Sequence, residues 1–197
     1  MSTIKATVDK YFAFMEEIGG LLAIDEQVPE IMHDVEKTTD IEDCAFWKPL
    51  DSSITEIEIK ELEEYFGHEV PATYKMFLQH KHFVELQLGG GIDFFPNVPG
   101  RLITQTKGII DEYYPSLIER NYLPFARLGD HGVVAFDANK ESAGNNYPIV
   151  TFTHDDEYDV PEEYAMNFED MFNEFDSHLN AWIETYRSKE KTPHNST

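Results

Sequence analysis

The sequence predicts an α+β fold in which helices pack on a mostly antiparallel sheet. Two observations carry this prediction. Apolar residues recur at helical spacing over residues 54–66 and 167–187. Between these segments lie three short apolar runs, at 123–128, 133–137 and 149–153, which turn-rich segments separate. Strands joined by turns form an antiparallel meander, whereas parallel strands need long crossover connections.

Near the N-terminus a helix is predicted over residues 4–18, and the Gly-Gly pair that follows ends it. Its apolar face holds six residues: Ile4, Val8, Tyr11, Phe12, Met15 and Ile18. A second short helix is predicted over residues 29–37, with three buried residues: Ile31, Met32 and Val35. Residues 38–51 are predicted to form a loop that Phe46 and Trp47 anchor.

The clearest local signals lie between residues 54 and 78. Thr55 precedes Glu58 by three residues, which predicts a capping box in which each side chain bonds the backbone amide of the other residue. Gly67 is expected to end this helix, because glycine adopts the left-handed conformation of a C-terminal cap. Pro71 then begins a second helix with three apolar residues on one face: Tyr74, Phe77 and Leu78.

Weaker signals complete the expected fold. Apolar and polar residues alternate over 83–88, which predicts a strand, and a Gly-Gly-Gly turn and a short strand over residues 92–95 follow. Residues 102–114 are predicted to form a helix that a proline ends. Asn167 is expected to cap the last helix, with Asp170 as its third residue. Its apolar stripe has eight members: Phe168, Met171, Phe172, Phe175, Leu179, Trp182, Ile183 and Tyr186.

Short motifs in a fixed order point to a known family. They are Trp47-Lys48-Pro49-Leu50, Pro71 with Tyr74, Lys75, Phe77 and Leu78, Leu123-Pro124-Phe125-Ala126 with Gly129-Asp130, Val133 to Asp137, Pro148-Ile149-Val150, and Asn167-Phe168 with Met171-Phe172. From about residue 46 to about residue 176, this arrangement resembles the SUKH superfamily, the Smi/Knr-like immunity and regulatory proteins.

The resemblance implies a single α+β, SUKH-like domain with a mostly antiparallel sheet of about five or six strands. The helices over 54–66 and 167–187 are expected to pack on this sheet and to bury four residues: Leu62, Phe77, Phe172 and Trp182. The chain then divides into an N-terminal helical extension packed on the domain (1–45), the SUKH-like domain (46–187) and a polar tail (188–197).

Charge limits the classes of partner. The 197 residues include 38 acids against 15 lysines and arginines, a formal net charge of −23. Binding to nucleic acid or to anionic lipid depends on Lys and Arg that neutralise phosphate, so direct binding to either is not expected. A basic protein partner is expected instead. A single cysteine, Cys44, and the lack of a signal peptide or an apolar span predict a cytoplasmic protein.

Acidic residues cluster towards the C-terminus, where twelve acids and no lysine or arginine lie between Lys140 and Arg187. Six of them follow a predicted strand and precede the last helix, which predicts an exposed loop that binds the partner. These six are Asp155, Asp156, Glu157, Asp159, Glu162 and Glu163. Simple solvation of a soluble protein would explain the same cluster, and the sequence leaves both interpretations open.

No motif for catalysis or metal binding is complete. His80 and His82 would share one face of a strand, with Glu85 as a third ligand, but zinc sites show a fuller pattern. The acidic run that begins at Asp155 has the spacing of an EF-hand loop, but Val160 stands where glycine is needed. No serine lies in a Gly-x-Ser-x-Gly motif. The sequence therefore predicts a protein that is not an enzyme and has no metal or cofactor.

The resemblance and the charge together predict a function. Bacterial proteins of this kind are immunity proteins, encoded beside toxins that are often nucleases, and a nuclease that grips phosphates is basic. The expected partner is therefore a basic toxin domain, neutralised by direct binding. One alternative is a regulatory scaffold of the Smi/Knr type. Another is an enzyme, or a protein that binds a metal or small ligand, using residues around 129–131. The sequence leaves the oligomeric state open.

Overall fold

The computed structural model describes residues 3–130, 132–140, 143–153, 158 and 160–190. Its centre is an antiparallel sheet in the order β5-β6-β7-β8-β9, which confirms the predicted α+β class. The strands of this sheet are β5 (Ile92–Phe94), β6 (Tyr122–Leu128), β7 (Gly132–Asp137), β8 (Ile149–Phe152) and β9 (Glu162–Ala165). Two antiparallel pairs lie outside it: β1 (Leu21–Ile24) with β2 (Cys44–Trp47), and β3 (Leu50–Asp51) with β4 (Lys81–His82).

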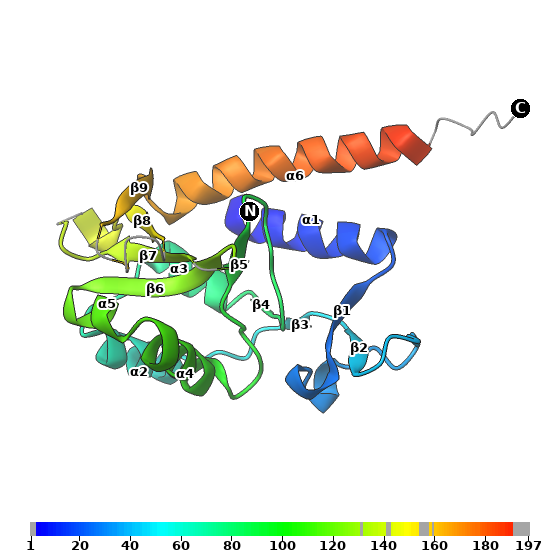
Figure 1. Cartoon of the computed structure of the whole chain (residues 1–197), viewed down its shortest axis with the longest axis horizontal. Coiled ribbons are helices and arrows are strands. Elements are labelled where there is room, and N and C mark those ends of the chain that lie inside the picture. Colours follow the sequence, from blue (N-terminus) through cyan, green and yellow to red (C-terminus); the bar gives the residue numbers. More distant parts are fainter. Residues whose placement is uncertain (1–2, 131, 141–142, 154–157, 159, 191–197) are drawn as a thin grey trace, which may run out of the picture.

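Helices cover the sheet on both faces. They are α1 (Thr3–Glu17), α2 (Glu56–Phe66), α3 (Ala72–Leu78), α4 (Leu102–Tyr113), α5 (Pro115–Glu119) and α6 (Phe168–Glu190). Single 3-10 turns occupy Asp25–Gln27, Glu30–Met32 and Ala143–Asn145. In Figure 1, α6 lies above the sheet, and α2 and α4 lie below it. Among the described residues, no helix has the length and apolar character that crossing a membrane requires.

The main core is an aromatic cluster between the sheet and helices α3 and α6. Phe168, the first residue of α6, is fully buried at its centre. Its ring packs against the rings of Tyr74, Phe77, Phe94, Phe125, Phe136 and Phe172. Every residue of β7 is buried, because helices cover both faces of the sheet there. These contacts explain why the strands around β7 are continuous apolar runs.

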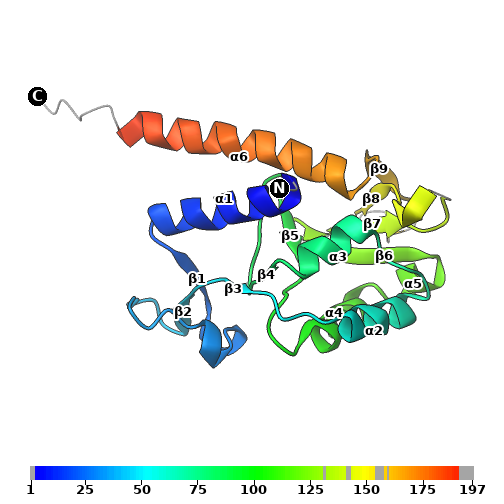
Figure 2. The ribbon, with the colours of Figure 1, turned by 180° about the vertical axis from the view of Figure 1, so that it is seen from behind.

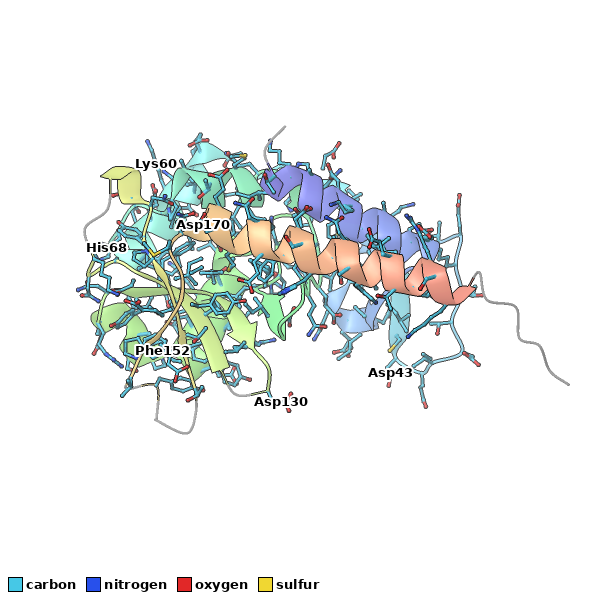
Figure 3. All side chains as sticks on the ribbon, turned by 90° about the horizontal axis from the view of Figure 1, so that it is seen from above. Asp43, Lys60, His68, Asp130, Phe152 and Asp170 are labelled. Carbon is cyan, nitrogen blue, oxygen red and sulfur yellow. The ribbon has the colours of Figure 1, made fainter. Side chains whose placement is uncertain are left out.

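Helix α1 runs alongside α6, as the views in Figures 1, 2 and 3 agree. Thr7 Oγ1, which is fully buried, donates a hydrogen bond of 2.9 Å to Asp176 Oδ1. Lys10 Nζ lies 2.6 Å from the same oxygen. Further along, the rings of Phe14 and Trp182 meet edge to face at 4.8 Å. One end of the chain is thus fixed to the other by polar and aromatic contacts.

The local helix signals are confirmed. Thr55 Oγ1 accepts from the amide of Glu58 at 3.3 Å, and the amide of Thr55 donates to the Glu58 carboxylate at 2.9 Å. Gly67 follows α2 with φ 70°, the left-handed conformation expected of a C-terminal cap. Asn167 Oδ1 accepts from the amide of Asp170 at 2.9 Å. Caps depend on neighbours in the sequence, so the sequence alone predicts them well.

The helix predicted over residues 29–37 is wrong. A 3-10 turn at Glu30–Met32 and a second turn at residues 35–36 take its place. Met32 is buried as predicted, but Ile31 and Val35 are 67% and 84% exposed. The backbone here runs beside β2, since the amide of Asp34 donates to the carbonyl of Phe46 at 2.8 Å. The loop predicted over residues 38–51 is wrong as well, because it contains β2 and β3. Pairing with a distant strand overrides the local apolar spacing.

Three other expectations need correction. Trp182 is 45% exposed, because α6 extends beyond the sheet. The segment 83–88 forms isolated bridges with residues 93–97 rather than a regular strand. The proline after α4 does not simply end that helix but begins α5. Leu62, Phe77 and Phe172 are buried as predicted.

Candidate functional site

The structure describes only part of the acidic segment predicted to bind the partner. Asp155, Asp156, Glu157 and Asp159 lie outside the described residues. Glu162 and Glu163 are exposed as predicted, but they belong to strand β9 at the edge of the sheet rather than to a loop. Glu162 pairs with Thr151 and Glu163 with Val150. Charged residues are common on edge strands, because they discourage further pairing, and they hide the apolar alternation of a strand.

The charge on β9 is partly neutralised. Glu163 Oε1 accepts a hydrogen bond of 2.7 Å from Lys140 Nζ. This hydrogen bond, together with the positive charge of Lys140, lowers the pKa of the Glu163 carboxyl. The edge strand therefore presents less free negative charge than its sequence indicates.

A second acidic surface lies near the N-terminus, on residues 21–51, which we call the hairpin lobe. In it β2 pairs with β1 on one side, and His33 bridges to Trp47 on the other. The Trp47 side chain is buried. Figures 1 and 2 show the lobe below α1 and beside the main sheet. Figure 3 places Asp43 on the lobe, at the opposite end of the molecule from His68.

The surface of the hairpin lobe combines acids with exposed aliphatic side chains. Residues 24–43 include eight acids and one lysine, a formal charge of −7. Four large aliphatic residues on this segment are exposed: Ile24, Ile31, Val35 and Ile41. Exposed apolar side chains with a polar rim are typical of protein interfaces, and the acids favour a basic partner.

Two adjoining pockets lie between the lobe and the main domain, and both are lined by Glu85 and Asp93. We call them together the Glu85–Asp93 hollow. The larger, of about 370 Å³, opens towards α4 and also contacts Gln27 of the lobe. The smaller, of about 340 Å³, is lined by Tyr11 of α1 and by Trp47 of β2. The hollow is thus built from five parts of the chain: α1, the hairpin lobe, residues 84–96, α4 and β6.

Cross-strand pairing brings the two carboxylates to one face. Gln87 bridges to Asp93, and Glu85 precedes Gln87 by two residues. Residues two apart on an extended chain point to the same side, so Glu85 and Asp93 are diagonal neighbours. The intervening Leu86 and the neighbouring Phe94 point into the core.

The hollow holds these carboxylates in an unfavourable environment. Glu85 is exposed by its accessible area and Asp93 is half-buried. Partial loss of solvent still raises the pKa of Glu85, and the negative charge of Asp93 raises it further. Burial also raises the pKa of Asp93, although the Arg127 guanidinium partly opposes this. Arg127 lies directly across from Asp93 on β6. Such carboxylates are stabilised by any cation that enters.

The histidines that suggested a metal site have other partners. His80 Nε2 lies 2.8 Å from Asp9 Oδ1. His82 is buried rather than exposed to solvent, and its Nε2 accepts from the amide of Ser53 at 2.9 Å. That leaves Nδ1–H to donate to the carbonyl of Asn97 at 3.1 Å. Within the parts of the chain that the structure describes, no three His, Cys, Asp or Glu side chains are grouped to hold a metal ion.

Sequence reasoning missed both surfaces. Residue 131, in the segment considered for ligand binding, lies outside the described residues. A signal for the hollow was available, since Glu85 and Asp93 lie in two segments whose apolar residues are buried. A signal for the lobe is the mixture of acids and aliphatic residues over 24–43. Part of this segment, residues 29–37, is predicted above as a helix with a buried face.

The architecture is that of an α+β domain whose central sheet and helices α2 to α5 form one unit. Residues 53–174 match the model of the SMI1 / KNR4 family (SUKH-1). The match covers more than half of the chain, and this protein belongs to that family. Comparison with curated proteins finds no match. Helix α1, the whole hairpin lobe and residues 175–190 of α6 lie outside the matched residues.

Proposed function

We propose that this protein is a non-catalytic immunity protein that binds and neutralises a basic toxin domain, with a nuclease as the first candidate. Membership of the SMI1 / KNR4 family supports a role of the immunity or Smi/Knr type. The observation that carries the proposal is the hairpin lobe, with its eight acids and four exposed aliphatic residues over 24–43.

The chemistry of the lobe suits such a partner. A nuclease domain exposes lysines and arginines that contact phosphate, so acids on the immunity protein attract it and accelerate association. Aliphatic side chains then contribute affinity, because their contact surface is removed from water. Ile31 and Val35 are exposed in the described chain, so both remain available for this contact.

The experiment is growth rescue. The toxin is a basic domain encoded beside the gene for this chain. Bacteria that express it are co-transformed with a plasmid for the wild-type protein, and growth is measured. Binding is measured with the two purified proteins. The wild type is expected to restore growth. The Ile31→Ser, Val35→Ser variant is expected to bind at least ~10-fold more weakly, as for central interface residues.

The matched control is Ile57→Ser, because Ile57 is 69% exposed on α2, outside the lobe. It is expected to bind like the wild type. Failure of the wild type to bind or to protect would contradict the immunity function and favour the regulatory role. If the wild type protects and the lobe variant binds the toxin as well as the Ile57→Ser control does, the immunity function stands. The lobe is then not the docking surface.

A further inference from the structure

The larger pocket of the Glu85–Asp93 hollow has more hydrogen-bond acceptors than donors. Glu85, Asp93 and Glu112 line it with three carboxylates, against the guanidinium of Arg127 and the hydroxyl of Tyr113, which donates to Glu112. Gln105 also lines it, and its buried Oε1 accepts no hydrogen bond from any residue that the structure describes. A buried acceptor without a donor is unfavourable. A ligand rich in N–H groups would satisfy this surplus.

A glycine keeps the pocket open on the side of α4. Gly108 lies in the interior of α4 and lines the pocket. Glycine is the poorest residue in a helix interior after proline. A Cβ added there would meet no described atom within 4 Å, so packing does not require glycine. The absent side chain leaves space where a ligand would lie.

The smaller pocket supplies the opposite polarity. Trp47 lines it and is 2% exposed, and its Nε1–H has no acceptor among the described residues. A buried indole N–H usually donates to an oxygen. The two pockets meet at Glu85 and Asp93. The hollow therefore suits a ligand that combines a cationic, donor-rich group with a carbonyl oxygen, which is the chemistry of an arginine residue in a peptide.

We propose that the Glu85–Asp93 hollow binds the guanidinium of an arginine side chain, with Glu85, Asp93 and Gln105 as its acceptors. A guanidinium carries five N–H donors in a plane and pairs with carboxylates in two-fold contacts, so it matches several acceptors better than an ammonium group does. That the arginine belongs to a protein partner rests on the proposed function, whereas the binding of a guanidinium does not.

The test uses N-acetyl-arginine amide as the probe and the full chain carrying Trp182→Phe. Trp47 is then the only tryptophan, and its fluorescence reports on the hollow. A saturable change in fluorescence is expected at low salt. The citrulline analogue of the probe has the same shape without the charge, and it is expected to bind at least ~10-fold more weakly.

Two variants in this background locate the binding. Glu85→Gln with Asp93→Asn is expected to weaken binding of the arginine probe at least ~10-fold. Gly108→Leu is expected to abolish it by filling the pocket, and circular dichroism confirms that the variant is folded. The matched control, Glu162→Gln with Glu163→Gln, removes the same number of charges from β9 and is expected to bind like the parent.

The proposal is overturned if the citrulline probe binds equally well, if the parent shows no saturable signal, or if the hollow and β9 variants behave alike. Toxin binding by the Glu85→Gln, Asp93→Asn variant identifies the source of the arginine. Weaker toxin binding supports an arginine carried by the partner. Probe binding with unchanged toxin binding overturns that assignment and supports a free guanidinium compound as the ligand. Failure of the wild type to rescue growth would contradict only the proposed function, whereas failure of the probe to bind would contradict only the guanidinium site. The two failures are therefore distinguishable.

Discussion

The family-matched domain and the hairpin lobe use apolar side chains in opposite ways. In the matched domain the aromatic rings of Phe77, Phe125 and Phe168 are buried against one another. In the lobe Ile31 and Val35 face solvent among acids, although other apolar residues of the lobe, including Met32 and Trp47, are buried. Apolar side chains of the domain therefore stabilise the fold, whereas those of the lobe leave apolar surface exposed, as the proposed docking role requires.

Phe168→Ala is expected to show the largest difference in stability between the family-matched domain and the hairpin lobe. Because this ring is at the centre of the aromatic cluster, its loss is expected to destabilise the protein by about 3–5 kcal/mol, measured by urea denaturation. Val35→Ala in the lobe is expected to change the free energy of unfolding by less than about 0.5 kcal/mol. Equal losses for the two variants would show that the Val35 side chain is buried in the folded protein and unavailable for docking.

Asp176→Asn tests how firmly α1 is fixed to α6. Burial raises the pKa of Asp176, but hydrogen bonds from Lys10 and Thr7 outweigh it, and the net shift is downward. A carboxylate whose pKa is lowered by folding stabilises the protein at pH values above 3.8, its pKa in the unfolded chain. This stabilisation is lost as the pH falls through the lower pKa of the folded protein. The variant is expected to lose about 1 kcal/mol near neutral pH.

Urea denaturation of wild type and variant at several pH values checks this prediction, since the difference between them should shrink in acid. Arg187→Gln is the control, because its pair with Glu17 is exposed, and no change in the urea midpoint is expected. A difference that is independent of pH would mean that the charge of Asp176 does not hold the helices together.

Glu85→Gln with Asp93→Asn sharpens the comparison at the boundary between the two regions. Folding raises the pKa of Glu85 above 4.5 and that of Asp93 above 3.8, so the folded protein binds protons more readily than the unfolded chain does. The stability of the protein therefore rises as the pH falls through the raised pKa values. At neutral pH the variant is expected to be more stable, by no more than about 0.5 kcal/mol after allowance for solvent screening.

The measurement is the urea midpoint at about pH 7 and at about pH 5, where protonation of the wild type should reduce its deficit. The same pair of carboxylates would then weaken the fold and strengthen binding of a cation. A variant less stable than the wild type at neutral pH would indicate instead that Arg127 already satisfies both acids.

The sequence predicts those features of the fold that depend on residues close together along the chain. The caps at Thr55 and Asn167 and the apolar runs of β6 to β8 need no knowledge of distant residues. The lobe is not predicted, because the apolar spacing of Ile31 and Val35 indicates a buried helix face, whereas both side chains are exposed. The prediction that Trp182 is buried is wrong for a related reason, since α6 extends past the sheet that would have covered this residue.

The candidate site is the least predictable part. Glu85 and Asp93 meet only because the chain returns after the glycine turn with Gln87 opposite Asp93. A shift of one residue in this pairing would turn one of the carboxylates towards the core. Gln105 and Gly108 join them from a helix that is ten or more residues further on. Such a site depends on register and on helix packing, and neither is visible in local spacing.

The pairing of α1 with α6 has a consequence for the order in which the chain is made. Thr7 and Asp176 are 169 residues apart, so α1 leaves the ribosome long before its partner helix exists. Until then the apolar face around Val8 and Phe14 has no α6 to cover it. Contacts between such distant residues form late in folding. Closure of α1 onto α6 therefore completes only in a chain that has been translated through Arg187, and a chain released earlier presents an uncovered apolar helix to chaperones and proteases.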